Sequence, residues 1–267
     1  MRAELEEMRV SGVPVTIFGN WLRRRRLNCA RSQDMTPSKE NRRQFVSFSF
    51  YRVSPEWRRL PQVERAEHRR EFAEVIRRWS EQVGVLGYSL VGLRADCDFL
   101  LWRIAYSLDE LQEMSAHLLR THLGGYIQKP YSYLSMTRRS KYMIGSDRGQ
   151  HSELPAMLKP GGCKYLFVFP MVRTRNWYVL PFEERERMVH ELTRAGHEFT
   201  KAHANVMYSF GLDDQDFVIT VETDEPSEML ERVLRLRESD SSTYVQRDTP
   251  NFTCVRATIE EMLEKIG

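Results

Sequence analysis

Two of the seven histidines of this 267-residue chain lie in one short stretch, RERMVHELTRAGHEF, at residues 185–199. His190 and His197 are candidate metal ligands, because a neutral imidazole nitrogen binds transition metals. Their spacing of seven residues corresponds to a rise of about 10.5 Å along a helix. That is too far for both to bind one ion at about 2 Å, and the zinc-binding helix motif has its two histidines four residues apart. We therefore interpret both as surface histidines.

Both histidines belong to a segment whose apolar residues predict a helix over 181–202. Spacings of three and four residues place its apolar side chains on one stripe, which is expected to pack on a sheet. That stripe consists of Met188, Val189, Leu192, Ala195, Gly196 and Phe199. The histidines fall on the opposite stripe, together with Arg187, Arg194 and Lys201. Leu192 is therefore the inward position, and His190 points outward.

Other familiar catalytic motifs are absent from the sequence, which has no P-loop, GxGxxG, HExxH or GxSxG pattern. The pair Asp213-Asp214 is expected in a strand turn, where aspartate is common for conformational reasons. The four cysteines show no CxxC spacing, which argues against structural zinc and a disulfide framework: Cys29, Cys97, Cys163 and Cys254. Reduced thiols in a cytoplasmic protein are the simplest interpretation.

The composition is that of a soluble globular protein, with 41% hydrophobic and 29% charged residues. We expect no membrane association, because no run approaches the roughly 18 apolar residues of a membrane span and MRAELEEMRV does not resemble a signal peptide. The net charge of +3 comes from the start of the chain, since residues 1–44 hold ten Lys/Arg and five Asp/Glu. Nucleic-acid binding by the slightly acidic remainder is not expected. The run WLRRRR at 21–26 suits a solvated tail, or alternatively a contact with RNA or an acidic surface.

The chain contains an internal repeat, which any account of the fold must explain. EWRRLPQVER at 56–65 matches NWYVLPFEER at 176–185, with an offset of 120 residues. GLRADCDFLLWRI at 92–104 matches GLDDQDFVITVE at 211–222, with an offset of 118 residues between Asp98-Phe99 and Asp216-Phe217. Because the blocks keep their order and nearly their spacing, the chain is interpreted as two copies of one unit.

Each copy predicts the same order of elements: a strand, a helix that starts at Leu-Pro, two strands around a turn, a second helix and a last strand. This order, βαββαβ, is the ferredoxin-like unit. Each sheet has helices on one face, so two sheets packed together bury their bare faces. We predict an α+β fold with two ferredoxin-like repeats that form an α+β barrel within one chain. The predicted parts are a basic, flexible extension over 1–43, a first unit over 44–137, a linker over 138–162 and a second unit over 163–267.

Several segments resemble the chlorite dismutase family, which includes the bacterial coprohaem decarboxylases. The matching stretches are FPMVRTRNWYVLPFEERERM, AGHEF, YSFGLDDQDFV, ETDEP, LRLRES and DTPNFTC, with KPYSYLSM in the first half. The similarity spans residues 45–267. It implies ferredoxin-like repeats in an α+β barrel, a homopentamer, and haem or coprohaem held in the second unit.

The resemblance also shows where this chain departs from the family. The family's proximal iron ligand is a histidine on the helix of the opening stretch, and Leu192 stands at that position. Leucine cannot bind iron, and His190 would serve only if the helix rotated or slipped. The tyrosine that coprohaem decarboxylases use as a radical site corresponds to Phe169, and the distal residue corresponds to Asn205. The loss of the distal arginine argues against chlorite decomposition.

Other positions of the family's pocket persist and are candidate cofactor-binding residues. Met171 and Arg173 lie on one predicted strand, and Arg173 is expected to meet a haem propionate. Trp177 keeps a family aromatic, and Tyr133 matches a family tyrosine. Structural explanations are equally simple: Trp177 has a twin in Trp57, Met171 suits an ordinary core, and Arg173 suits a solvated position.

Two functional hypotheses follow. The first is a haem-type oxidoreductase, most like the peroxide-dependent coprohaem decarboxylases, with haem or coprohaem as its cofactor. The second is a haem-free structural or ligand-binding oligomer that has lost the family's catalytic residues and has no cofactor. Both predict self-association, most simply as a homopentamer, and neither predicts a nucleic-acid or membrane partner.

Overall fold

The computed structural model describes the following residues of the chain: 43–142, 158, 160 and 162–267. Nearly all of the predicted basic extension and most of the predicted linker lie outside the described residues. Among the helices that are described, none is long and apolar enough to cross a membrane.

The first repeat has the predicted order of elements. Its strands β1, β2, β3 and β4 span Phe45–Val53, Gly84–Ser89, Phe99–Ala105 and Ile127–Met136. Its helices α3, α4 and α5 span Pro55–Arg58, Gln62–Trp79 and Leu108–Leu119, and a 3-10 turn, η2, covers Leu123–Tyr126. Ser107 and Glu110 form a capping box at the start of α5, where the sequence predicts a helix N-terminus.

The second repeat follows the same order. Its strands β5, β6, β7, β8 and β9 span Tyr165–Arg173, His203–Tyr208, Phe217–Thr223, Val245–Arg247 and Phe252–Ala257. Its helices α6, α7 and α8 span Arg175–Val179, Phe182–His197 and Pro226–Arg237, and a 3-10 turn, η3, covers Asp240–Tyr244. A further helix, α9, spans Ile259–Lys265. The predicted fold class, α+β with two ferredoxin-like repeats, is confirmed.

The offset between the two copies changes along the chain. It is 120 residues between β1 and β5, 119 between β2 and β6, and 118 between β3 and β7. From the start of its first long helix to its second strand, the second copy is therefore one residue shorter, because α7 has 16 residues and α4 has 18. The next connection is also one residue shorter in the second copy.

The two copies also share a partly buried hydrogen bond at the end of their first strands. In the first copy, Asp98 Oδ2 accepts from the backbone N–H of Val53 at 2.7 Å. In the second, Asp216 Oδ2 accepts from the backbone N–H of Arg173 at 2.8 Å. These turn carboxylates satisfy backbone donors that would otherwise be lost at the strand ends. The aspartate of the repeated Asp-Phe motif is therefore a structural residue in both copies.

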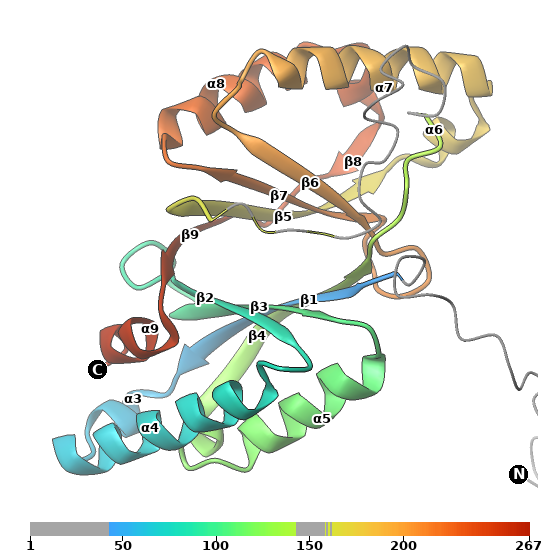
Figure 1. Cartoon of the computed structure of the whole chain (residues 1–267). Helices are drawn as coiled ribbons and strands as arrows, with labels where there is room; N and C mark the ends of the chain where they lie inside the picture. Colours follow the sequence, from blue (N-terminus) through green and yellow to red (C-terminus); the bar gives the residue numbers. More distant parts are fainter. Residues whose placement is uncertain (1–42, 143–157, 159, 161) are drawn as a thin grey trace, which may run out of the picture. The chain divides into compact units, whose positions relative to one another are not determined.

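The strands form one antiparallel sheet whose pairing order returns to its start. The order is β7-β6-β4-β1-β3-β2-β9-β5, β7 also pairs with β5, and β8 adds to β5. Figure 1 shows α4 and α5 against the strands β1 to β4, and α7 and α8 against β5 to β7. Between the two groups of strands lies an inner core, whose largest side chains include Phe48, Phe50, Trp102, Tyr133 and Phe252.

The helix-facing side of the first repeat has its own core. Phe72 of α4, Leu101 of β3 and Met114 of α5 are fully buried there. The helix α9 completes this core, because Met262 and Leu263 pack into it and α9 lies against α4 and β2. The last helix of the chain therefore covers the first repeat.

The structure corrects some of the predicted details. The helix predicted over 181–202 ends at His197, and turns without helical structure follow it. Arg232 donates to the carbonyl of Gly196 at 2.7 Å, which satisfies one of the last carbonyls of α7. The predicted elements did not include α9, the two short helices α3 and α6, or the short strand β8.

Candidate functional site

The sheet of the second repeat presents a row of apolar side chains to α7 and α8. Cross-strand pairing places Phe169 of β5 and Val206 of β6 on either side of Ile219 of β7. The next pair on the same face is Phe167 with Val221. Because side chains alternate along a strand, these residues share one face of the sheet. We call this face and the inward stripe of α7 and α8 the second-repeat layer.

The helix α7 contributes Leu192 to the second-repeat layer. Leu192 is half-buried and lies on the same face as buried Met188 and Gly196, four residues before and after it. Its counterpart in the first repeat, 120 residues earlier, is fully buried Phe72. Both copies therefore place an apolar side chain at this inward position of the helix.

The two histidines of α7 are exposed, as the sequence predicts. His190 Nε2 lies 2.6 Å from the carbonyl oxygen of Tyr142, so the ring is held on the outer side of the helix. The structure therefore does not bring His190 to the face that carries Leu192. Among the described residues, no group of three or more His, Cys, Asp or Glu side chains is arranged to hold a metal ion.

The second-repeat layer is less completely buried than its counterpart in the first repeat. Its buried cluster consists of Ala202, Val221 and Met229, with four more apolar side chains that are partly buried: Phe167, Phe169, Phe199 and Val233. On β6, Val206 remains 49% exposed. Apolar side chains that face each other and stay accessible are the usual lining of a small-molecule site.

The difference between the repeats has an identifiable cause at one position. Gly87 of β2 is the counterpart of Val206, 119 residues earlier. A Cβ atom on Gly87 would lie 3.0 Å from Ile259 Cδ1 and 3.1 Å from Met262 Sδ, because α9 lies directly on this strand. Among the described residues, no helix equivalent to α9 packs on β6. The second-repeat layer is therefore open at β6.

Asn205, the predicted distal residue, lies on the other face of the sheet. It pairs with Thr220 across β6 and β7, and its amide nitrogen lies 3.3 Å from Thr220 Oγ1 and 3.4 Å from Glu222 Oε1. Its neighbours Ala204 and Val206 face the helices instead. The structure therefore does not bring Asn205 together with Phe169 and Leu192.

Arg173 is buried, which contradicts the interpretation of a solvated side chain. It is 7% exposed, its Nη1 donates to the carbonyl of Ser241, and its guanidinium stacks 4.2 Å from the ring centre of Trp177. Burial lowers the pKa of Arg173 to about 10. The side chain thus joins β5 to η3, and Trp177 is its stacking partner.

The two remaining predicted site residues lie on opposite faces. Tyr133 of β4 belongs to the inner core, where its ring contacts those of Phe50 and Phe252. Met171 of β5 pairs with Phe217 and faces the helices, at the edge of the second-repeat layer. Among the predicted site residues, Phe169 and Met171 thus share the sheet face toward which Leu192 of α7 is directed, whereas Tyr133 lies in the inner core.

Arg232 of α8 is a residue of this region that the sequence patterns did not identify. Its guanidinium lies against Gly196, where an added Cβ would meet Nη2 at 2.8 Å. Burial lowers the pKa of Arg232. Its counterpart, 118 residues earlier, is Met114 in the core of the first repeat. Comparison of the two repeats could have identified Arg232, because it places a charged side chain where the first repeat has the core residue Met114.

The side chains of the second-repeat layer are mainly apolar and suit contact with an apolar ligand. It offers aromatic and aliphatic side chains and the half-buried cation of Arg232. Leu192 and Phe169 have neither a metal ligand nor an exchangeable proton. The residues therefore fit the flat apolar ring of a porphyrin, and they do not fit ligation of an iron atom through α7.

Comparisons with known proteins agree with the repeats and the fold. A family model described as chlorite dismutase matches residues 65–257. Coproheme decarboxylase of Mycolicibacterium smegmatis is 32% identical over 183 residues, which are 67% of this chain and 75% of that protein.

Two solved structures show the same fold. Chlorite dismutase from Candidatus Nitrospira defluvii in complex with imidazole superimposes with a TM-score of 0.77 at 23% identity, over 83% of this chain and 94% of that chain. A heme-binding protein from Thermus thermophilus superimposes with a TM-score of 0.76 at 21% identity, over 86% of this chain and 97% of that chain.

Proposed function

This chain belongs to the chlorite dismutase family, and from that premise we propose that its second repeat binds a porphyrin without a histidine bond to the metal. The ligand class is that of its relatives, which include a coproheme decarboxylase and a structurally similar heme-binding protein. The ring would lie in the second-repeat layer, between α7 and the strands β5 to β7.

The observation that carries this proposal is that the second-repeat layer is open at β6. Val206 is 49% exposed where the first repeat is closed by α9 over Gly87. Covering apolar surface stabilises a complex by about 25 cal/mol per Å². A flat ring that entered at β6 would cover Val206, Phe169 and Leu192 together.

The residues of the layer argue against peroxide-dependent decarboxylation as the primary function. An iron porphyrin supplies redox chemistry only as its axial ligand and surroundings allow. Leu192 provides no axial ligand, and Phe169 has no hydroxyl group to donate a hydrogen atom or a proton. What this chain's own residues do is enclose the ring, with Arg232 as a nearby cation for its carboxylates.

Binding is tested with coproporphyrin III and with its iron complex, followed by absorbance and by quenching of tryptophan fluorescence. We expect both to bind with similar affinity, because the iron gains no ligand from α7. Val206→Glu should weaken binding by about tenfold or more, since it places a charge in the apolar entrance. Val63→Glu, at a position 80% exposed on α4, is the matched control.

The variant Leu192→His tests the position of the ring. It should strengthen binding of the iron complex and give an imidazole-type spectrum, while the affinity for metal-free coproporphyrin stays as it was. His190→Ala should change neither, because His190 is held outward at the Tyr142 carbonyl. If the wild type showed an imidazole spectrum that His190→Ala removed, the proposed placement of α7 would be wrong.

A second candidate function is the oxidoreductase activity of the coproheme decarboxylase type. The 32% identical relative favours it. Conversion of iron coproporphyrin by the wild-type chain in the presence of peroxide would establish it against the binding proposal. The double variant Phe169→Tyr with Leu192→His is the minimal change expected to introduce that activity.

The haem-free oligomer remains the alternative to both. Failure of the wild type to bind any of these porphyrins at micromolar concentration would favour it. We propose a homopentamer for the assembly, and light scattering that gave a 31.6 kDa monomer would contradict it.

A further inference from the structure

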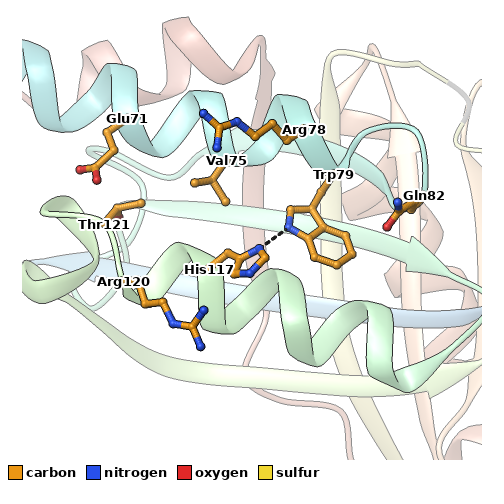
Figure 2. Close-up of a pocket in the computed structure, with 8 residues that line it drawn as sticks. All are labelled: Glu71, Val75, Arg78, Trp79, Gln82, His117, Arg120 and Thr121. Carbon is orange, nitrogen blue, oxygen red and sulfur yellow. Dashed lines mark hydrogen bonds between the residues drawn. The ribbon is translucent and has the colours of Figure 1, made fainter.

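A groove of about 520 Å³ lies on the first repeat, far along the chain from the second-repeat layer. It runs between α4 and the end of α5, and Figure 2 shows the side chains that line it. Val75 and Trp79 of α4 form its apolar wall, His117 of α5 points toward Trp79, and Arg120 lines the groove just after the end of α5. Nothing in the proposed porphyrin binding uses this groove.

A hydrogen bond fixes the chemistry of the central histidine. Trp79 Nε1 donates to His117 Nδ1 at 2.9 Å (Figure 2). An indole nitrogen is a donor only, so Nδ1 must be the acceptor. Neutral His117 therefore carries its proton on Nε2, which makes that atom a hydrogen-bond donor.

The charged side chains around the groove are mainly cationic. Arg120 has no carboxylate within 4 Å among the described residues, and Arg78 uses only its Nε, which donates to Glu74 Oε1 at 3.2 Å. The carboxylate of Glu71 is already engaged, because its Oε2 accepts from the backbone N–H of His122 and contacts the ring Nδ1, both at 2.8 Å. The groove thus has donors from two arginines and an imidazole.

The second repeat provides an internal comparison. With offsets of 120 on the first helix and 118 on the second, Arg78 corresponds to Glu198, His117 to Arg235 and Arg120 to Glu238. There the central cation is balanced from both sides, since Arg235 lies 3.5 Å from Glu198 and 3.5 Å from Glu238. In the first repeat both flanking residues are arginines. The negative charge that Glu198 and Glu238 supply in the second repeat is therefore missing there.

We propose that this groove binds a small organic oxyanion, a carboxylate or a phosphate monoester, with an apolar body. Its anionic group lies between Arg78 and Arg120 and accepts from His117 Nε2. Its apolar body lies against Trp79 and Val75. The guanidinium groups match the geometry of a carboxylate or phosphate, and the volume is within the usual range for small-molecule sites.

Calorimetric titration of the full chain with benzoate and with phenyl phosphate tests the proposal, and neutral benzamide is the reference ligand. We expect one or both anions to bind and benzamide not to bind. The probe that binds more tightly identifies the anionic group that the groove prefers. No binding of either anion would overturn the proposal.

The charge variants make the test specific to this groove. Arg120→Glu, and the double variant Arg78→Glu with Arg120→Glu, introduce the residues of the second repeat and should weaken binding by about tenfold or more. Arg70→Glu makes the same charge change on α4 outside the groove and should leave the affinity unchanged. Equal affinities of all variants would overturn the proposal, and far-UV circular dichroism would establish that each variant folds.

Discussion

Leu192 and Phe72 occupy the same position of the repeat, but Phe72 fills a closed core and Leu192 faces an open layer. They are equivalent residues of the two copies, and both face a sheet. Phe72 is surrounded by a complete core, whereas Leu192 faces a layer that is open at β6. The apolar stripe of α7 was sufficient to predict that Leu192 points inward. It could not show how much of the space beneath Leu192 the neighbouring side chains fill.

The sequence did not predict the partners of Arg173 or the face of the sheet on which Asn205 lies. Arg173 was placed on the correct strand, but its partners, Trp177 and the Ser241 carbonyl, come from different parts of the chain. Asn205 was assigned from the resemblance, and it follows a connection whose length differs by one residue between the copies. A shift of one residue moves a strand side chain to the opposite face.

Asp96 provides a pH prediction at the residue scale. Hydrogen bonds from Arg94, and also from Tyr131, hold its pKa at about 2, below the usual 3.8. Because the folded pKa is lower, the stabilisation is fully present above about pH 5 and is lost as the pH falls from 4 toward 2. Asp96→Asn should therefore lower the free energy of unfolding near pH 7, and its difference from the wild type should shrink in acid.

Urea unfolding at several pH values measures this difference. Glu231→Gln, which neutralises an exposed carboxylate on α8, is the control and should show little change at any pH. A difference for Asp96→Asn that stayed constant down to pH 2 would argue against the pairing with Arg94 and Tyr131.

At the scale of elements, the regular parts of the fold were accessible from the sequence. The alternating strands, the helices with one apolar stripe and the capping box at α5 all follow local rules. The helix α9 was missed because its role is not local. It is a short segment at the end of the second repeat, and its partners, α4 and β2, belong to the first.

The helix α9 should contribute strongly to stability. Met262 is fully buried in the core of the first repeat, so Met262→Ala is expected to cost about 2–5 kcal/mol of unfolding free energy. Leu230→Ala removes a side chain that is 62% exposed on α8 and should cost less than about 0.5 kcal/mol. Thermal and urea unfolding of the two variants make the comparison, and similar losses in both would contradict this role of α9.

At the scale of the whole molecule, β9 joins the two repeats. It pairs with β5 of its own repeat and with β2 of the first, where Gly87 lies opposite Ala257. The inner core is likewise shared, since Phe50 of β1 stacks on Phe252 of β9 with ring centres 3.9 Å apart. Neither repeat completes its buried surfaces alone.

We therefore expect the described part of the chain to unfold in a single transition. A fragment with residues 43–142 lacks β9 and α9 and should not fold by itself, although it holds every element of the first repeat. Circular dichroism and amide exchange of the fragment test this expectation. A fragment with a cooperative melting transition would show that the repeats are independent.

The position of α9 along the chain also bears on how the protein is made. The ribosome completes the strands and helices of the first repeat before it begins the second, yet Met262 and Leu263, which close the first core, are synthesised after the whole of β9. At about 5 to 20 residues per second, the 125 residues from 143 to 267 take about 6 to 25 seconds. During that interval the first repeat has an uncovered apolar strand at Gly87. A nascent chain of this kind is a natural client for chaperones that bind exposed apolar segments, and its demand for them ends when α9 docks.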